Sequence, residues 1–339
     1  MKKLLTLAVA IALILSVAVA SAATTLKLSE VHAEGYPTTL ADQEFARLVE
    51  ERTEGRIKIE VYSGGQLYGE ETGAIEALQL GDIAFSRVSA SPVSSYVPAM
   101  NAIQMPYLYK NADHMWAVLD GEIGQNMLAE IQASGSGLVG LCWYDAGARS
   151  FYTTKQVSTV ADLAGMKIRM QNNAMMVDMV NVLGGTGVTG IGPNEVYSAI
   201  KQGTIDGAEN NWPTYQNMGD YEAAPYYVLD EHTRVPEVLL ASEAVLSELD
   251  PADVEIIKEC AKETQEYEKQ KWAEKEEESE KIVREAGCTI TELTPEAYAE
   301  FQEAMTSPSD ALGGQSLYEK YGAEYQDIID AIAAVGENY

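Results

Sequence analysis

The segment RIKIEVYSGGQLYGEETGAIEALQLGDIAFSRVS, residues 56–89, decides the fold class. Apolar Ile57, Ile59 and Val61 alternate with polar residues, which predicts a strand over 56–62. A helix is expected over 69–80, ended by Gly81, and a further strand over 82–89. Strand, helix and strand of these lengths make a βαβ unit, which indicates an α/β layer with a largely parallel sheet.

The same alternation continues on both sides of this segment. Leu26, Leu28 and Val31 indicate a strand, and the helix after it carries an apolar face from Ala41 to Val49. The pattern further along predicts helices over 112–120, 122–134, 174–183, 193–202, 296–305 and 317–334, and strands over 138–144, 148–154, 166–170 and 289–293.

A long helix is predicted late in the chain. Asp250 is a strong N-cap and Pro251 fits the first helical position, so the helix should run from there to about Gly287. At 1.5 Å per residue it would be roughly 50 Å long, longer than one small domain is wide. Its charged stretch 271–280 is either simply a solvated face or the outward surface of a strut that lies across two domains.

The first 23 residues have the features of a Sec signal peptide. Lys2 and Lys3 precede the apolar run 4–19, and small residues follow up to Ala23. We expect cleavage after Ala22 or Ala23 and a periplasmic location. A membrane anchor is the alternative, but a stable span needs about 20 apolar residues. The remaining 24–339 exceed what one hydrophobic core usually serves, which predicts two domains.

The net charge of −29 restricts the partners of this protein. Nucleic acids and anionic membrane surfaces attract clustered Lys and Arg, so neither is an expected partner. A small anion remains possible as a ligand, provided that local arginines bind it against the long-range repulsion of the chain.

The three cysteines, Cys142, Cys260 and Cys288, do not form a disulfide framework. Cys142 lies in an apolar run and is expected to be a buried thiol. Whether Cys260 and Cys288 pair is left open by the sequence.

Two motifs suggest enzymes but lack the required context. The run 185–190 fits G-x-G-x-x-G, yet it follows a predicted helix, so we interpret it as a loop without a bound dinucleotide. His32-Ala-Glu34 is half of a zinc deaminase signature whose Pro-Cys-x-x-Cys half is missing. The only other histidines, His114 and His232, have no metal-ligand spacing. We therefore expect no metal, no cofactor and no enzymatic activity.

Arginine is scarce in this acidic chain, so the places where it occurs are informative. Arg87 and Arg169 lie near the ends of predicted strands, and Arg149 follows a tight glycine turn. Ligands of open α/β sheets bind beyond the carboxyl ends of strands, and a guanidinium can hold a carboxylate with two parallel hydrogen bonds. The alternative is that each arginine pairs with one of the many acids of the chain.

Three motifs together indicate a family: KIRMQNN at 167–173, PNEVY at 193–197 and IDGAENNWP at 205–213. With Gly-Gly-Gln-Leu at 64–67 and Pro-Tyr-Leu-Tyr at 106–109, they resemble the DctP-type substrate-binding proteins of TRAP transporters. The resemblance covers the whole mature chain. It implies a two-domain, periplasmic-binding-protein-like α/β fold with a ligand cleft between the domains and a long helix spanning both. Domain I would comprise 24–146 and 235–272, and domain II 147–234 and 273–339.

The resemblance also implies roles for individual residues. Arg169 would pair with the ligand carboxylate and Arg149 would assist it. Asn210 would hydrogen-bond the ligand, with Glu209 beside it. The implied partners are a small and a large membrane subunit, driven by an ion gradient, and the default oligomeric state is a monomer.

The segments 210–213 and 32–37 are most similar to a branch whose members bind sugar acids such as glucuronate or galacturonate. The residues that this branch implies as readers of the ligand hydroxyls are His32, Glu34, Arg87 and Asn172. Trp212 would pack on the apolar face of the ligand or belong to the core. Ser86 and the segment 189–192 depart from the usual pattern, so a C4-dicarboxylate, a keto acid or another organic acid stays open as the ligand.

Overall fold

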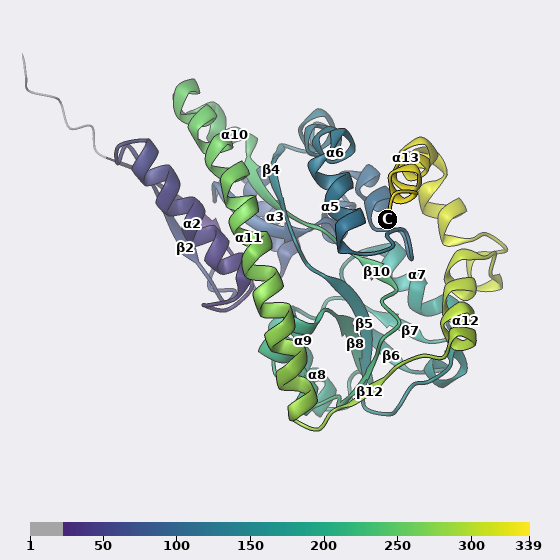
Figure 1. Ribbon diagram of the computed structural model, residues 1–339. Coiled ribbons are helices and arrows are strands. Elements are labelled where there is room, and N and C mark those ends of the chain that lie inside the picture. Colours follow the sequence, from purple (N-terminus) through teal and green to yellow (C-terminus); the bar gives the residue numbers. More distant parts are fainter. Residues whose placement is uncertain (1–22) are drawn as a thin grey trace, which may run out of the picture.

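A computed structural model describes residues 23–339, so nearly all of the expected signal peptide lies outside the described residues. The chain forms two β-sheets with helices packed around them, which confirms the predicted α/β fold (Figure 1). Within this described range, no helix combines the length and the apolar composition that crossing a membrane requires.

The first sheet has the strand order β2-β1-β3-β11-β4. β1 pairs with β2 and β3 in parallel, as the βαβ pattern predicts, whereas β11 pairs antiparallel with both β3 and β4. The sheet is therefore mixed rather than largely parallel, because β11 re-enters it in the opposite direction after the second sheet. Its strands are β1 (Thr24–Ser29), β2 (Ile57–Tyr62), β3 (Phe85–Ser89), β4 (Leu138–Tyr144) and β11 (Glu237–Ser242).

The second sheet has the order β12-β9-β5-β8-β6-β7, and β10 pairs with β5. β6 is parallel to both of its neighbours, and β5 is antiparallel to β8 and β9. The predicted loop over 185–190 contains one of these strands, β7. The strands are β5 (Ala148–Thr153), β6 (Lys167–Arg169), β7 (Thr186–Val188), β8 (Gly207–Asn210), β9 (Tyr226–Val228), β10 (Thr233–Arg234) and β12 (Thr289–Thr291).

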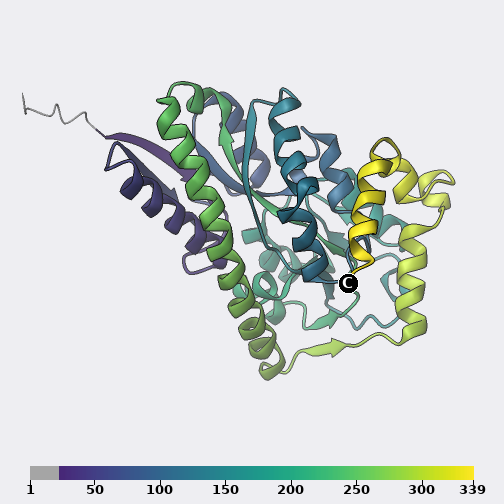
Figure 2. The same cartoon turned by 45° about the horizontal axis from the view of Figure 1, so that its top comes forward.

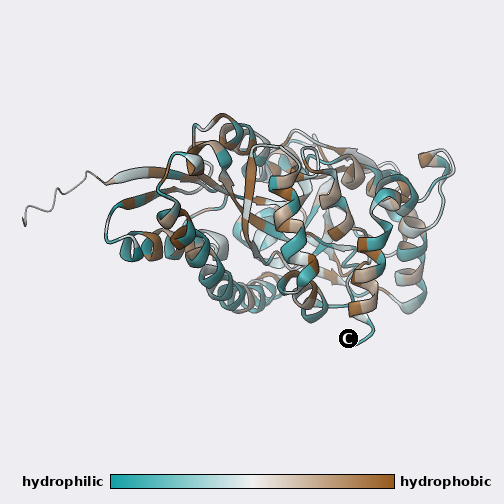
Figure 3. Cartoon of the chain, turned by 90° about the horizontal axis from the view of Figure 1, so that it is seen from above, coloured by the Kyte–Doolittle hydropathy of each residue, from teal (hydrophilic) through white to brown (hydrophobic). Residues whose placement is uncertain are grey.

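Helices cover the sheets with their polar faces outward, as the hydropathy colours indicate (Figure 3). α2 packs on β2, α3 on β3, α6 on β4 and α7 on β7. The α-helices other than the long α11 are α2 (Pro37–Arg52), α3 (Glu71–Leu80), α4 (Ala90–Val93), α5 (Ala112–Asp120), α6 (Glu122–Ala133), α7 (Ala174–Val182), α8 (Val196–Lys201), α9 (Trp212–Asn217), α10 (Glu243–Ser247), α12 (Pro295–Thr306) and α13 (Gln326–Gly336). The predicted helix over 317–334 starts later than expected, because residues 318–322 form a π-helical turn and residues 323–325 a 3₁₀ turn before α13.

The long helix α11 (Pro251–Glu285) runs along both sheets (Figure 2). The Asp250 carboxylate accepts a hydrogen bond from the amide of Ala252 at 2.8 Å, so the N-cap forms as predicted. The first half of α11 packs on α2 and β4, and the second half packs on α9. The helix therefore spans the two halves of the molecule, as the strut interpretation requires.

The proposed domain boundaries put each sheet in its own domain. The chain passes between the sheets at residues 145–147 and 235–236, and a large buried apolar cluster joins Trp143 and Val238 of the first sheet to Ile168 of the second. The C-terminal segment differs from the proposed division: α13 packs on α5 and α6 of the first domain, and residues 318–322 pack on residues 98–103. Its buried Ile329 and Ile332 belong to the shared apolar cluster.

Candidate ligand-binding site

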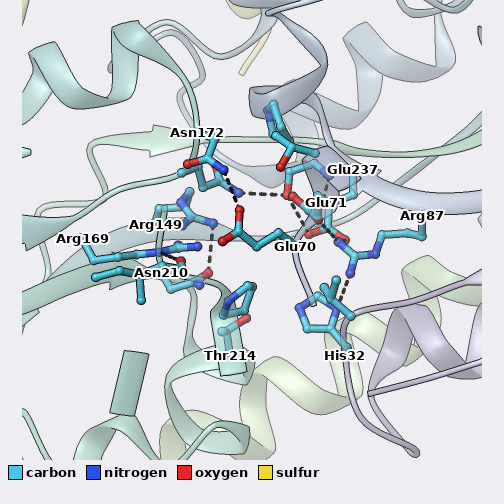
Figure 4. A pocket seen from close by; sticks show the side chains of 17 residues that line it. His32, Glu70, Glu71, Arg87, Arg149, Arg169, Asn172, Asn210, Thr214 and Glu237 are labelled. Atoms are coloured by element: carbon cyan, nitrogen blue, oxygen red, sulfur yellow. Dashed lines mark hydrogen bonds and ion pairs between the residues drawn. The ribbon is translucent and has the colours of Figure 1, made fainter. Parts of the chain in front are cut away.

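A cavity lies between the two sheets, beyond the carboxyl ends of β1, β3 and β6 (Figure 4). It encloses about 530 Å³ of space that no atom occupies, part of which is open to solvent. Sites for small molecules commonly lie at such strand ends. The polar residues that line it are His32, Glu70, Glu71, Thr72, Arg87, Ser89, Arg149, Arg169, Gln171, Asn172, Asn210, Thr214 and Glu237.

Arg169 is the cation of this cavity that has no counter-ion among residues 23–339. It is the last residue of β6, its side chain is only 8% exposed, and its Nε donates to the carbonyl of Ile191 at 2.9 Å. Among the ion pairs formed within residues 23–339, none involves Arg169. Burial lowers its pKa, but a guanidinium keeps its proton in proteins. A buried, charged and unpaired group is costly, so this position favours an anion in the cavity.

Arg149, on β5, is by contrast held by a carboxylate. Its Nη2 donates to Glu209 Oε1 at 2.8 Å, and its Nη1 donates to Asn210 Oδ1 at 3.0 Å. Antiparallel pairing places Glu209 opposite Phe151 and Asn210 opposite Ser150. This register brings Glu209 and Asn210 of β8 next to Arg149 of β5. Arg149 and Asn210 therefore reach the cavity with their orientations fixed from behind.

Buried Glu209 and His232 form the support behind Arg149. Although burial opposes ionisation, Arg149 and His232 hold the pKa of Glu209 at about 2. Burial likewise disfavours the charged form of His232, but Asp230 and Glu209 raise its pKa to about 9. His232 Nδ1 lies 2.8 Å from Asp230 Oδ2, so the protonated ring is held between two carboxylates.

Arg87, on β3, lies in the opposite wall of the cavity and is surrounded by acidic side chains. It pairs with Glu30, with Glu71 at 2.6 Å and with Glu237 at 3.2 Å. Its Nη2 also donates to His32 Nδ1 at 2.9 Å. Burial and the Arg87 charge lower the pKa of His32, which favours the neutral ring, and because Nδ1 accepts from Arg87 the ring proton is assigned to Nε2. His32 thus offers a hydrogen-bond donor at the cavity wall.

The cleft is closed over this cavity by direct contacts between its two sides. Asn172 Nδ2 donates to Glu70 Oε2 at 3.1 Å, and Asn194 Nδ2 donates to the carbonyl of Val31 at 3.3 Å. Two loops approach so closely that a Cβ added at Gly192 would lie 2.8 Å from the carbonyl oxygen of Gly69. A glycine at position 192 is therefore what permits this degree of closure.

The structure brings six of the nine predicted site residues to the cavity wall: Arg169, Arg149, Asn210, Arg87, His32 and Asn172. The other three lie outside it. Glu209 lies behind Arg149, and Trp212 stacks on Tyr227 at 4.0 Å in the core of the second domain. Glu34 is exposed and accepts a hydrogen bond from Gln43 at 2.6 Å.

Sequence reasoning missed three carboxylates of the wall, Glu70, Glu71 and Glu237. The first two follow the Gly-Gly-Gln-Leu motif and begin α3, so that motif was an available signal. Glu237 begins β11, a strand that the sequence analysis did not identify. Within the described part of the chain, no group of three or more His, Cys, Asp or Glu side chains is arranged to hold a metal ion.

Comparison with known proteins places this geometry among solute-binding proteins. The family model DctP, bacterial extracellular solute-binding protein family 7, matches residues 28–312. A solute-binding protein of Chromohalobacter salexigens is 34% identical over 299 residues, which span 88% of this chain and 84% of that protein.

Two solved structures are similar over almost their whole length. A TRAP periplasmic solute-binding protein from Pseudomonas putida F1 with bound D-glucuronate is 37% identical, with a TM-score of 0.85 over 91% of this chain and 97% of that chain. One from Xanthobacter autotrophicus Py2 with bound β-D-galacturonate is 36% identical, with a TM-score of 0.84 over 91% of this chain and 99% of that chain.

Proposed function

Because the chain belongs to the DctP family, family 7 of the bacterial extracellular solute-binding proteins, we propose that it captures a uronate for a TRAP transporter. D-Glucuronate and D-galacturonate, which two similar proteins hold in their crystal structures, are the proposed ligands. The protein would work in the periplasm as a monomer without enzymatic activity and would deliver its ligand to a small and a large membrane subunit.

The unpaired guanidinium of Arg169 carries this proposal. The three arginines of the cavity differ in their partners, because Glu209 neutralises Arg149 and Glu30 neutralises Arg87. Only Arg169 has no carboxylate within ion-pairing distance among residues 23–339. A ligand carboxylate at Arg169, assisted by Arg149 and the amide of Asn210, satisfies a charge that the protein leaves open.

The remaining wall suits a ligand rich in hydroxyl groups. His32 Nε2, Thr214 and Asn172 offer donors or exchangeable hydroxyls, and the carboxylates of Glu70 and Glu71 accept hydrogen bonds. A site built to hydrogen-bond several hydroxyls rejects analogues that lack them, since its own polar groups would then stay unpaired. This pattern favours a sugar acid over a short keto acid.

A thermal-shift panel on the mature protein tests the ligand class. D-Glucuronate or D-galacturonate at about 100 times its dissociation constant should add about 2.7 kcal/mol of stability and raise the melting temperature by about 5 °C. C4-dicarboxylates, keto acids and neutral sugars serve as comparison ligands. A shift with dicarboxylates or keto acids alone would keep the transport role and replace the ligand, and a shift with neutral sugars alone would contradict the role of Arg169.

Domain closure around the ligand is the second part of the proposed mechanism, and Gly192→Ala tests it. Gly192 has an ordinary φ of −63°, so alanine fits its backbone, but the new Cβ would meet Gly69 at 2.8 Å and force the loops apart. Overpacking of this kind costs about 1–3 kcal/mol, and we expect uronate affinity to fall about tenfold by isothermal titration calorimetry.

Gly69→Ala is the matched control, because a Cβ at that position meets no atom within 4 Å. It should bind like the wild type, and both variants should melt at the unliganded wild-type temperature. Equal affinities of G192A and the wild type would show that the ligand does not require this closed arrangement.

A further inference from the structure

The cavity has two ends of opposite charge, and they come from different domains (Figure 4). Arg169 and Arg149, with Asn210, form the end contributed by the second domain. Glu70, Glu71 and Glu237, with Arg87, form the acidic end contributed by the first domain, and the Glu70 carboxylate extends from it toward Asn172. The proposed function uses the basic end for the ligand carboxylate, so the acidic end faces whatever lies at the far side of the ligand.

The acidic end has more carboxylates than cations to neutralise them. Arg87 is the cation of this end, and it is shared between Glu71, Glu237 and the buried Glu30 behind them. Burial, with the charges of Glu71 and Glu30, raises the pKa of Glu237 to about 8. At neutral pH the Glu237 carboxyl is therefore largely protonated, and the negative charge around Arg87 lies on Glu71 and Glu30.

Glu70 adds a further carboxylate that no cation neutralises. Its Oε2 accepts a hydrogen bond from Asn172 Nδ2 at 3.1 Å, and no ion pair within residues 23–339 includes it. A further acceptor at this end, Gln171 Oε1, is buried without a hydrogen-bond donor inside the described range. The chemical requirement of this end is for hydrogen-bond donors that carry no negative charge.

We propose that the acidic end, where Glu70 and Glu71 carry the negative charge, selects acids with one carboxylate and a hydroxylated far end, and rejects sugar diacids. The inference rests on the proposed function, because it takes the carboxylate at Arg169 as given. Hydroxyl groups donate to the carboxylates, whereas a second ligand carboxylate can only accept and is repelled by them. The acidic end would thus determine specificity between ligands that Arg169 binds equally well.

The test compares D-gluconate with D-glucarate, which are both acyclic and differ only at C6, a CH₂OH in one and a carboxylate in the other. Each is used to displace D-glucuronate from the wild-type protein in competition calorimetry. Opposed like charges at binding sites are strongly unfavourable, so we expect the inhibition constant of glucarate to be about 100-fold higher. Raising the salt concentration should reduce this ratio.

Glu70→Gln is the informative variant, because Glu70 makes no ion pair whose loss would disturb the fold. It should reduce the ratio of the inhibition constants of glucarate and gluconate about tenfold, because it removes one of the charges that repel the second carboxylate of glucarate. Glu300→Gln is the matched control, since Glu300 is an exposed carboxylate outside the cavity, and it should leave the ratio unchanged.

The outcomes separate this inference from the proposed function. Failure of D-glucuronate and D-galacturonate to bind at all would overturn the proposed function itself. If a uronate binds but gluconate and glucarate inhibit equally, or neither inhibits at any soluble concentration, the charge-selection inference is wrong. A ratio that E70Q leaves unchanged would equally contradict it, because the discrimination would then not come from this carboxylate.

Discussion

Replacing Arg169 with alanine is expected to weaken uronate binding by about 1,000-fold while the protein stays folded. Removing one partner of a buried, hydrogen-bonded charge pair typically costs about 2–5 kcal/mol, and about 4 kcal/mol corresponds to this factor. The unliganded melting temperature should not fall, since Arg169 has no ion pair with a described residue and its side chain donates its hydrogen bond to the backbone carbonyl of Ile191. Calorimetric titration with D-glucuronate and a melting curve measure the two effects.

Arg47→Ala provides the control, because Arg47 is an exposed arginine that pairs with Glu44 and Glu51 on the surface of α2. It should bind like the wild type, since exposed pairs contribute little. Arg169→Lys should retain part of the affinity, because an ammonium keeps the charge but cannot form the two parallel hydrogen bonds that a guanidinium makes to a carboxylate. Affinity of R169A within tenfold of the wild type would contradict the role of Arg169 as the anion anchor.

The largest effect on stability is expected from Glu209→Gln. The Glu209 carboxylate lies fully buried between the Arg149 guanidinium and the protonated His232 ring. Its neutral replacement leaves the buried Arg149 guanidinium without a counter-ion among residues 23–339 and leaves His232 with Asp230 alone. Breaking a buried pair in this way costs about 3–5 kcal/mol. Urea unfolding of the variant and the wild type at neutral pH measures the difference, and a difference below about 1 kcal/mol would contradict the assigned geometry.

The same group predicts how stability depends on pH. The folded pKa of Glu209, about 2, lies below its ordinary value of 4.5, so its contribution is present above 4.5 and is lost as the pH falls toward 2. The folded pKa of His232, about 9, lies above its ordinary 6.5, so its contribution is present below 6.5 and is lost as the pH rises through 9. Each shift is worth about 3 kcal/mol.

The free energy of unfolding of the wild type should therefore decrease below pH 4.5 and above pH 6.5. E209Q should lack the decrease at acid pH that Glu209 causes. Unfolding free energies measured between pH 4.5 and pH 9 follow the His232 part of the curve. Stability that rises between pH 6.5 and pH 9 would have the wrong sign for a buried histidine stabilised by Asp230 and Glu209.

Much of the fold could be predicted from local sequence signals. Alternating Ile57, Ile59 and Val61 mark a half-buried strand, and Asp250-Pro251 marks the start of α11, because each signal acts within a few residues. β11 was missed for a physical reason. It is a central strand with both faces buried, so its apolar residues run on without alternation and do not distinguish strand from helix.

The site could be predicted only in part, because pairing across the fold leaves no local signal. The sequence placed Arg87 and Arg169 near strand ends and Arg149 after a tight glycine turn, and the family resemblance singled out Arg169 as the partner of the ligand carboxylate. With 52 acidic residues in the chain, any of them had many possible partners. Glu30 lies 57 positions from Arg87, and Glu209 lies 60 positions from Arg149. Only the folded arrangement shows that Arg169 has no carboxylate partner among residues 23–339.

A crystal structure of the mature protein with D-glucuronate tests the central claim most directly. The ligand carboxylate should accept hydrogen bonds from Arg169, with Arg149 and Asn210 beside it, and the ring hydroxyls should face Glu70, Glu71 and His32. A ligand bound in the opposite direction, with its carboxylate at Arg87, or a uronate bound without contact to Arg169, would contradict the account.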